Sequence, residues 1–228
     1  MSTSDQFPLV VVIIRHGEKP GDPDGNDGGP NLSILGSARA AALPSLFTSD
    51  PTQSPATLPQ LACDLSGSST EGEFNGVYAF STAQAGPPRS FNFDFLFATA
   101  PTNSSSRPVE TITPTLEALK VFNNNPTLII NDNYTDDDNG IKGITTEIMK
   151  NPATYGGKKI LICWHHGTIP QLTEAFGVPA SQLPFQKWPG TVFDLIFGIT
   201  FPSGNPILGV TFQKLLYGDS STLPGQSD

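Results

Sequence analysis

The chain has 228 residues, of which 37% are hydrophobic, so it can bury one sizeable core, and we expect a single domain over residues 1–228. Its formal net charge of −9 and isoelectric point near 4.6 argue against nucleic acid and anionic membranes as partners, because both would be repelled. No apolar run approaches the about 20 residues of a membrane span, and the start MSTSDQF lacks the pattern of a secretory signal, so we expect a cytoplasmic protein.

The first predicted element is a buried strand. Residues 8–15, PLVVVIIR, form an apolar and largely β-branched run, which is typical of a strand covered on both faces. The following GDPDGNDGGPN, residues 21–31, is a loop by its glycines, prolines and aspartates. Residues 32–47 then predict a helix, because alanine favours the helical state and Ser33 can cap the first turn.

A long polar stretch follows this helix. Residues 49–90 are rich in Ser, Thr, Pro, Gly and Gln and contain one possible strand, GVYAFS at 76–81. A segment of this length is either a functional excursion or partly disordered. As an excursion it could form a lid that selects substrate, and its deletion would then change substrate preference.

Strands and helices alternate through the rest of the chain. We expect strands at 93–100, 126–131 and 158–166, and helices at 106–122, 141–151 and 169–177. Ser106 and Pro108 suit the start of their helix, and Gly177 suits the end of the last one. Two final strands, 191–201 and 207–218, are expected to be antiparallel neighbours at a sheet edge. This pattern predicts a three-layer α/β/α sandwich with a mainly parallel central sheet, whose ligand site lies beyond the carboxyl ends of the strands.

The cysteines and histidines do not suggest a metal centre. Cys63 and Cys163 lie far apart in the sequence, and Cys163 sits in an apolar run, so two buried thiols are favoured over a disulfide. Neither these cysteines nor the three histidines have the spacing of zinc ligands. We therefore expect no metal and no cofactor.

Polar groups follow three of the predicted strands at the edge where a ligand should bind. The first strand ends in Arg15 and His16, the second leads to Arg107 at a helix start, and the third ends in His165 and His166. Guanidinium groups hold phosphate oxygens in a bidentate fork, and a helix start adds N–H donors. A neutral imidazole can attack phosphorus and carry the phosphoryl group. The pattern therefore indicates a site for a phosphorylated small molecule or a phosphate ion.

Four short motifs give the chain a resemblance to a known family. RHGE after an apolar strand, LSxxGxxRA beyond it, SRPVET in mid-chain and a late HHG occur in the order and on the elements typical of the histidine phosphatase superfamily. The resemblance extends from residue 8 to about 217 and leaves 49–90 uncovered. It implies a phosphoglycerate mutase-like fold and a metal-independent phosphoryl transfer.

The resemblance also implies roles for individual residues. His16 would be the nucleophile that becomes phosphohistidine, and Arg15 and Arg107 would bind the phosphoryl oxygens. His166, which precedes a glycine, would be the second histidine of the pocket. In a regular strand His165 would point the other way, so His166 is preferred over it.

Other polar residues have simpler roles that compete with a functional one. Asn31 and Ser33 could contact substrate at the mouth, as could Glu18, although a loop turn and a helix cap are the simpler roles of the first two. Arg89 is a rival to the mid-chain arginine but lacks a helix start. Arg39 is expected on the exposed side of its helix, in ordinary ion pairs.

The proton donor for the leaving group stays open. One branch of the superfamily places an aspartate directly after the late histidine, but this chain has Gly167 there. The other branch uses a glutamate after the mid-chain helix, where this chain has only aspartates. Glu18 and Glu110 are further candidates, and an ion pair to Arg107 is the simpler role of Glu110. The aspartates that could supply the proton are Asp132, Asp136, Asp137 and Asp138.

Three functions follow from these features. A phosphomonoester hydrolase is favoured, and its alternative is a phospho-ligand-binding protein that kept the pocket and lost turnover, because no obvious acid is present. A mutase is disfavoured, because the flexible acidic loop EKPGDPDGNDGGPN, residues 18–31, replaces the Asn-, Arg- and Trp-rich stretch of the mutases. The stretches QKWPGTVFDLIFGI, residues 186–199, and QKLLYGDS, residues 213–220, are expected to complete the sheet and to pack over the flank of the site.

Overall fold

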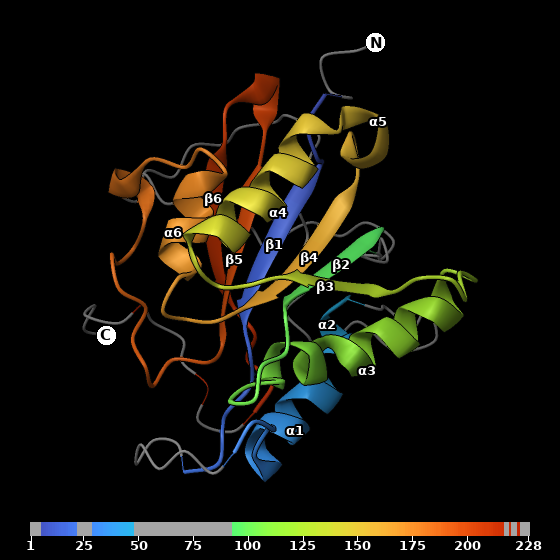
Figure 1. The fold of residues 1–228 in the computed structure, drawn as a ribbon, viewed down its shortest axis with the longest axis vertical. Coiled ribbons are helices and arrows are strands. Elements are labelled where there is room, and N and C mark those ends of the chain that lie inside the picture. The colour runs from blue at the N-terminus through green and yellow to red at the C-terminus, as the bar shows by residue number, and fades with distance from the viewer. Residues whose placement is uncertain (1–5, 22–28, 48–92, 217–218, 220–222, 224–228) are drawn as a thin grey trace.

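A computed structural model describes residues 6–21, 29–47, 93–216, 219 and 223 of the chain. One six-stranded sheet crosses the molecule in the order β3-β2-β4-β1-β5-β6 (Figure 1). Its strands are β1 (Val10–Arg15), β2 (Phe95–Thr99), β3 (Ile130–Tyr134), β4 (Lys159–Trp164), β5 (Leu195–Thr200) and β6 (Ile207–Phe212). Strands β3, β2, β4 and β1 are parallel to one another, whereas β5 is antiparallel to both β1 and β6.

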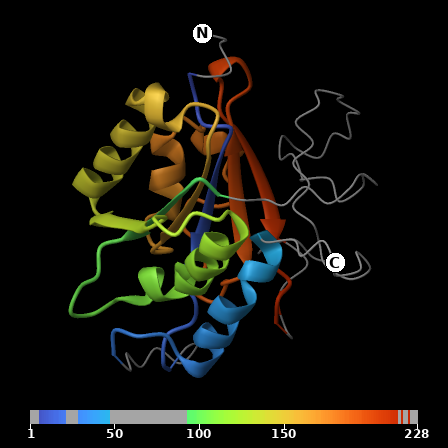
Figure 2. The same ribbon diagram turned by 90° about the vertical axis from the view of Figure 1, so that its right-hand side faces the viewer.

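Helices cover both faces of this sheet. They are α1 (Ile34–Ala42), α2 (Pro44–Phe47), α3 (Arg107–Phe122), α4 (Asp138–Lys150), α5 (Pro152–Tyr155) and α6 (Ile169–Ala175). Helices α4 and α6 lie on one face, and α1 and α3 lie together on the other (Figure 2). The predicted three-layer α/β/α architecture with a mainly parallel sheet is confirmed. Among the described residues, no helix is long and apolar enough to cross a membrane.

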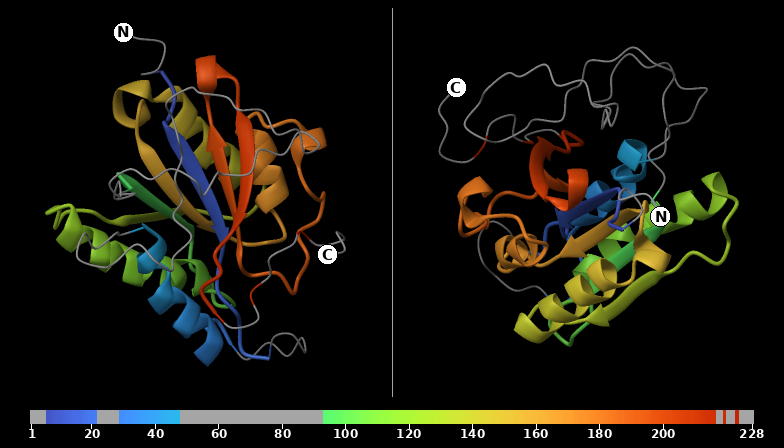
Figure 3. Two further views of the ribbon diagram at one scale, coloured as in Figure 1. Left: turned by 180° about the vertical axis from the view of Figure 1, so that it is seen from behind. Right: turned by 90° about the horizontal axis from the view of Figure 1, so that it is seen from above.

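Strand β1 lies in the middle of the sheet, and every one of its residues is buried. Its side chains alternate between two apolar clusters: Val11 and Ile13 pack with α4 and α6, and Val10, Val12 and Ile14 pack with α2, α3 and Leu43, which follows α1. Seen from behind, β1 runs between β4 and β5 (Figure 3). Burial on both faces explains why the sequence shows a continuous apolar run here rather than an alternating one.

Several boundaries differ from the sequence expectations for local reasons. The third strand is Ile130–Tyr134 rather than 126–131, because residues 126–128 form a turn and loop after α3 and the polar end of the strand carries no apolar signal. The helix expected over 32–47 is two helices, α1 and α2, because Pro44 cannot continue the first one. The two final strands are antiparallel neighbours as predicted, with β6 at the edge.

Some predictions fall outside the described residues. These are the possible strand at 76–81, the excursion at 49–90, Cys63 and Arg89. Cys163 is a fully buried thiol on β4. This agrees with the expectation of a buried thiol at Cys163, and the same expectation for Cys63 stays a prediction.

Candidate active site

The ring of His16 is buried just beyond the end of β1 and has a defined tautomer. Its backbone N–H donates to the Trp164 carbonyl of β4 at 3.2 Å, so the pairing of the two strands continues one residue past β1. Its Nδ1 lies 2.7 Å from the Gly17 carbonyl oxygen. Because a carbonyl can only accept, Nδ1 carries the ring proton and Nε2 keeps its lone pair when the ring is neutral. Nε2 is thus the ring nitrogen that can act as an acceptor or as a nucleophile.

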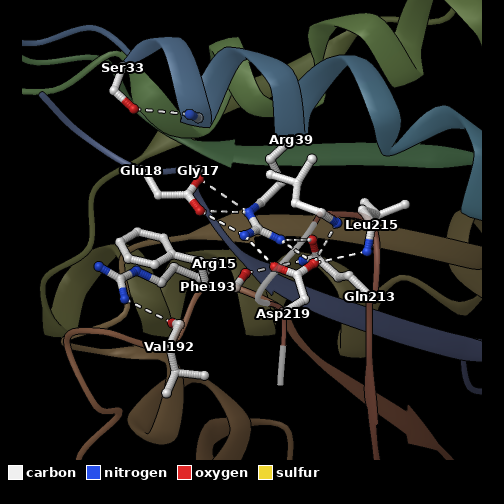
Figure 4. A network of polar contacts seen from close by, with 12 residues as sticks. Arg15, Gly17, Glu18, Ser33, Arg39, Val192, Phe193, Gln213, Leu215 and Asp219 are labelled. Atoms are coloured by element: carbon white, nitrogen blue, oxygen red, sulfur yellow. Dashed lines mark hydrogen bonds and ion pairs between the residues drawn. The ribbon is translucent and has the colours of Figure 1, made fainter. Parts of the chain in front are cut away.

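Arg15 is held next to this ring by the loop that precedes β5. Its Nη1 donates to the carbonyls of Gly190 at 2.6 Å and Val192 at 2.9 Å. Its guanidinium carbon lies 3.5 Å from the centre of the Phe193 ring, in a cation–π contact. Figure 4 shows Arg15, Val192 and Phe193 together. The expectation that residues 186–190 flank the site is consistent with these contacts.

Arg107 lies at the start of α3 and approaches the same ring. Its Nη1 donates to the Gly29 carbonyl at 2.9 Å, and its Nε has no hydrogen-bond partner among the described residues. A cation at a helix start is disfavoured by the helix dipole and gains most from a nearby anion. The buried position of Arg107, beside His16, fits the binding of an anion there.

Two further imidazoles lie edge-on to His16, and His165 is the nearer. The ring centres of His16 and His165 are 5.0 Å apart, and those of His16 and His166 are 6.3 Å apart. Strand β4 ends at Trp164, so the strand alternation that favours His166 does not extend to these residues. The register that pairs Arg15 with Trp164 brings His165 beside His16. Of the two rings, that of His165 therefore lies nearer to His16, and the choice of His166 as the second histidine stays a prediction.

Burial and the arginines set the protonation of the site. Desolvation lowers the pKa of His16 well below its usual value, and the charge of Arg15 lowers it further. Desolvation also lowers the pKa of His165, where Arg107 and Arg15 add to the effect and Asp136 opposes it. Both rings are therefore neutral at pH 7 before an anion binds, as a nucleophilic imidazole requires.

Glu18 does not face substrate, and Arg39 is not exposed. Arg39 is 3% exposed, and its Nη2 lies 2.7 Å from Glu18 Oε1 and 2.8 Å from Asp219 Oδ1. Its Nη1 also reaches Gln213 Oε1 at 3.3 Å (Figure 4). The prediction of a substrate contact for Glu18 is wrong, because the buried guanidinium of Arg39 takes both of its carboxylate oxygens. The expectation that Arg39 lies on the exposed side of its helix is also wrong, because its guanidinium is buried between Glu18 and Asp219.

Hydrogen bonds join the residues just before α1 to the start of α3. Ser33 caps α1 by accepting from the Gly36 N–H at 3.0 Å, which confirms the cap. Glu110 accepts from the Leu32 N–H and the Ser106 hydroxyl, at 2.8 and 2.6 Å. The Ser106 hydroxyl also lies 2.9 Å from the exposed Asn31, at its Oδ1. The ion pair expected between Glu110 and Arg107 is thus replaced by hydrogen bonds that tie the loop to α3.

The four candidate aspartates lie in different local environments. Asp137 caps α4 by accepting from the Gly140 N–H at 2.8 Å, and this bond lowers the pKa of its carboxyl group. A carboxyl group with a lowered pKa is ionised at neutral pH and carries no proton to give, so Asp137 is not a suitable acid. Asp138 begins α4, and Asp132 lies on the edge strand β3. Asp136 is exposed, and its charge acts on His165, so among the four it is the carboxylate that the structure connects to the site.

Neither Thr111 nor the backbone carbonyls that hold Arg15 were identified from the sequence. Thr111 Oγ1 accepts from the Gly17 N–H at 2.9 Å, which ties α3 to the loop after β1. Its position one helical turn after Arg107 was the available signal. The carbonyls around Arg15 belong to backbone and leave no trace in the side-chain pattern. Among the described residues, no three His, Cys, Asp or Glu side chains form a group that could hold a metal ion.

No family model and no curated protein matches the chain. Solved structures with a similar arrangement include a phosphoglycerate mutase from Bacillus anthracis, at 12% identity and a TM-score of 0.47, covering 92% of this chain and 94% of that one. A putative alpha-ribazole-5'-P phosphatase from Escherichia coli has 13% identity and a TM-score of 0.47, with 92% and 98% covered. A mycobacterial glucosyl-3-phosphoglycerate phosphatase has 11% identity and a TM-score of 0.48, with 90% and 97% covered. Similarity at this level assigns no activity, so the functional assignment depends on the residues of the site.

Proposed function

We propose that this chain belongs to the histidine phosphatase superfamily and hydrolyses phosphomonoesters of small molecules through a phosphohistidine on His16. The observation that carries the proposal is the 2.7 Å contact between His16 Nδ1 and the Gly17 carbonyl, in a buried ring next to Arg15. This contact leaves Nε2 with its lone pair, and the neighbouring cation is placed to attract a phosphate group.

The first chemical step transfers the phosphoryl group to the protein. His16 Nε2 attacks phosphorus, a P–N bond forms, and the P–O bond to the leaving group breaks. Arg15 and Arg107 stabilise the charge on the phosphoryl oxygens, which is where the transition state gains most. The leaving oxygen takes a proton from an acid and departs as an alcohol.

The second step regenerates the enzyme. Water attacks phosphorus and gives one proton to the carboxylate that acted as the acid in the first step, the P–N bond breaks, and inorganic phosphate leaves while Nε2 recovers its lone pair. In this proposal His165 donates a hydrogen bond to a phosphoryl oxygen, a role supported by the position of its ring beside that of His16. The two arginines supply the positive charge that a metal ion supplies in other phosphatases, so the scheme requires no metal.

Asp136 is our candidate for the acid of the first step. Its charge acts on His165, and it follows the end of β3, beyond the carboxyl ends of the parallel strands. Asp136→Asn should slow hydrolysis of an alkyl phosphate by about 10²–10⁴-fold, because an alkoxide leaves poorly without a proton. It should leave hydrolysis of an aryl phosphate with an acidic phenol nearly unchanged. Asp132→Asn is the matched control, and equal losses on both substrates would remove Asp136 from this role.

The direct test is the mass of the intact protein after rapid quenching without acid, using an activated aryl phosphate. Wild type should gain one phosphoryl group transiently, and His16→Ala should gain none and lose activity by at least about a thousandfold. His166→Ala is the matched control for His165→Ala, and only the latter should approach the loss of His16→Ala. Full activity of His16→Ala would refute the proposal.

A phospho-ligand-binding protein without turnover is the second candidate. The observation that favours it is that Glu18, Glu110 and Asp137 all have structural partners, which leaves few carboxyl groups to act as an acid. This protein would bind inorganic phosphate through Arg15 and Arg107 and form no adduct with the aryl phosphate. Calorimetric titration with phosphate, together with the mass experiment, separates the two functions.

A further inference from the structure

Gly17 is fixed from several sides, although it has no side chain. Its N–H donates to Thr111 Oγ1 at 2.9 Å, and its carbonyl accepts from His16 Nδ1 at 2.7 Å. A Cβ atom added to Gly17 would lie 2.9 Å from the Gly36 carbonyl oxygen and 3.1 Å from the Leu32 side chain. The position of this residue, and so the direction of its carbonyl, is set by α1 and α3.

The Thr111 hydroxyl can hold Gly17 in one orientation only. It is fully buried and donates its single hydrogen to the Arg107 carbonyl at 2.7 Å. An oxygen lone pair therefore faces the Gly17 N–H, and the hydroxyl cannot turn to present its hydrogen there. Threonine is a weak helix former, and its bond to the carbonyl four residues back disturbs a helix slightly, so this position carries a small cost within α3.

We infer that Thr111 is a positioning residue for the nucleophile: through Gly17 it fixes the tautomer and the orientation of the His16 ring. The expected effect of Thr111 on the reaction rate rests on the proposed role of His16, whereas the expected effect on the ring tautomer does not. One hydrogen-bonded series runs from the Arg107 carbonyl through the Thr111 hydroxyl and the two backbone groups of Gly17 to His16 Nδ1. The residue that would bind phosphate and the residue that would attack it are thus connected through one side chain.

Removing the hydroxyl should change the ring rather than the fold. In Thr111→Val the shape of the side chain is kept, but the buried Gly17 N–H loses its partner, which is unfavourable. The backbone of Gly17 can relieve this only by moving, and its carbonyl then leaves His16 Nδ1. The tautomer with the proton on Nε2 becomes accessible, and that tautomer cannot attack phosphorus.

The chain contains a matched control for this variant. Thr115 lies one turn further along α3, is equally buried, and its Oγ1 has no hydrogen-bond partner among the described residues. Thr115→Val removes the same group from the same helix without touching Gly17. Thr111→Ser keeps the hydroxyl and removes only the methyl group.

The experiment compares these three variants with wild type in two measurements. The rate of His16 phosphorylation by an activated aryl phosphate should fall about 10–100-fold in Thr111→Val with little change in KM, since a small misplacement of a reacting group has effects of this size. Thr111→Ser and Thr115→Val should stay within about threefold of wild type, which is a smaller change than the loss expected for Thr111→Val. ¹⁵N NMR of the His16 ring at pH 7 should show a protonated Nδ1 in wild type and a mixture of tautomers in Thr111→Val.

The two measurements keep this inference separate from the proposed function. If His16→Ala is fully active, the proposed function fails, and the NMR comparison still tests whether Thr111 fixes the ring. An unchanged tautomer and rate in folded Thr111→Val would overturn the inference. So would an equal loss in Thr111→Ser, because the methyl group rather than the hydroxyl would then matter. Thermal unfolding of each variant shows whether the protein compared is folded.

Discussion

Replacement of Arg39 by methionine should destabilise the protein strongly, because it leaves two carboxylates buried without their cation. The side chains of Glu18 and Asp219 are only 7% and 6% exposed and lie 2.7 and 2.8 Å from the guanidinium. Breaking a buried ion pair by removing one partner costs about 3–5 kcal/mol, whereas an exposed pair contributes about 1 kcal/mol or less. At about 2–4 °C per kcal/mol for a chain of this size, the melting temperature should fall by about 6–20 °C.

Urea unfolding at pH 7 measures this free energy, with Arg39→Met, Glu18→Gln and the double variant compared with wild type. The double variant should be more stable than Arg39→Met, because it no longer buries the unpaired charge of Glu18. Lys120→Met, which breaks the exposed pair with Glu117 at 3.0 Å, is the matched control and should change stability by less than about 1 kcal/mol. Equal small losses for Arg39→Met and Lys120→Met would refute the reasoning from burial.

Three further predictions concern protonation, close packing and the buried thiol. The His16 ring should remain neutral at pH 6.5 when titrated by NMR, since burial and Arg15 lower its pKa; a midpoint at or above 6.5 would contradict this. At pH values between the pKa of His16 in the folded protein and its usual value of about 6.5, the unfolded chain binds more protons at this ring than the folded protein does. The contribution of His16 to the free energy of unfolding should therefore rise with pH across that interval and be constant above it. Gly36→Ala should destabilise the protein by about 1–3 kcal/mol in urea unfolding, because a Cβ atom there would lie 2.3 Å from the Glu18 carbonyl oxygen. This loss is expected although alanine favours helices. The control Ser37→Ala, on the exposed side of α1, should not destabilise the protein. Cys163 should resist thiol reagents in the folded protein and react on unfolding, because burial raises its pKa. Rapid labelling at pH 8 in the native state would contradict this.

The sequence by itself determined the strands that carry the site. A continuous apolar run indicates a strand buried on both faces, and β1 and β4 have such runs because both lie in the middle of the sheet. The caps at Ser33 and Gly177 were also readable, because each acts within one turn of its own helix. Local signals of this kind depend only on residues close together in the chain.

Only the tertiary structure decided which polar groups meet. Arg39 looks like a surface residue of an alanine-rich helix, yet Asp219, from the far end of the chain, meets it at 2.8 Å and makes its burial possible. Strand alternation would separate the directions of His165 and His166, yet β4 ends at Trp164 and both rings lie edge-on to His16. Thr111 looks like an ordinary helix residue until Gly17 approaches its hydroxyl. These pairings join residues distant in the sequence, and a hydrogen bond or ion pair leaves no periodic pattern in either partner, so only the packing of the elements against one another specifies them.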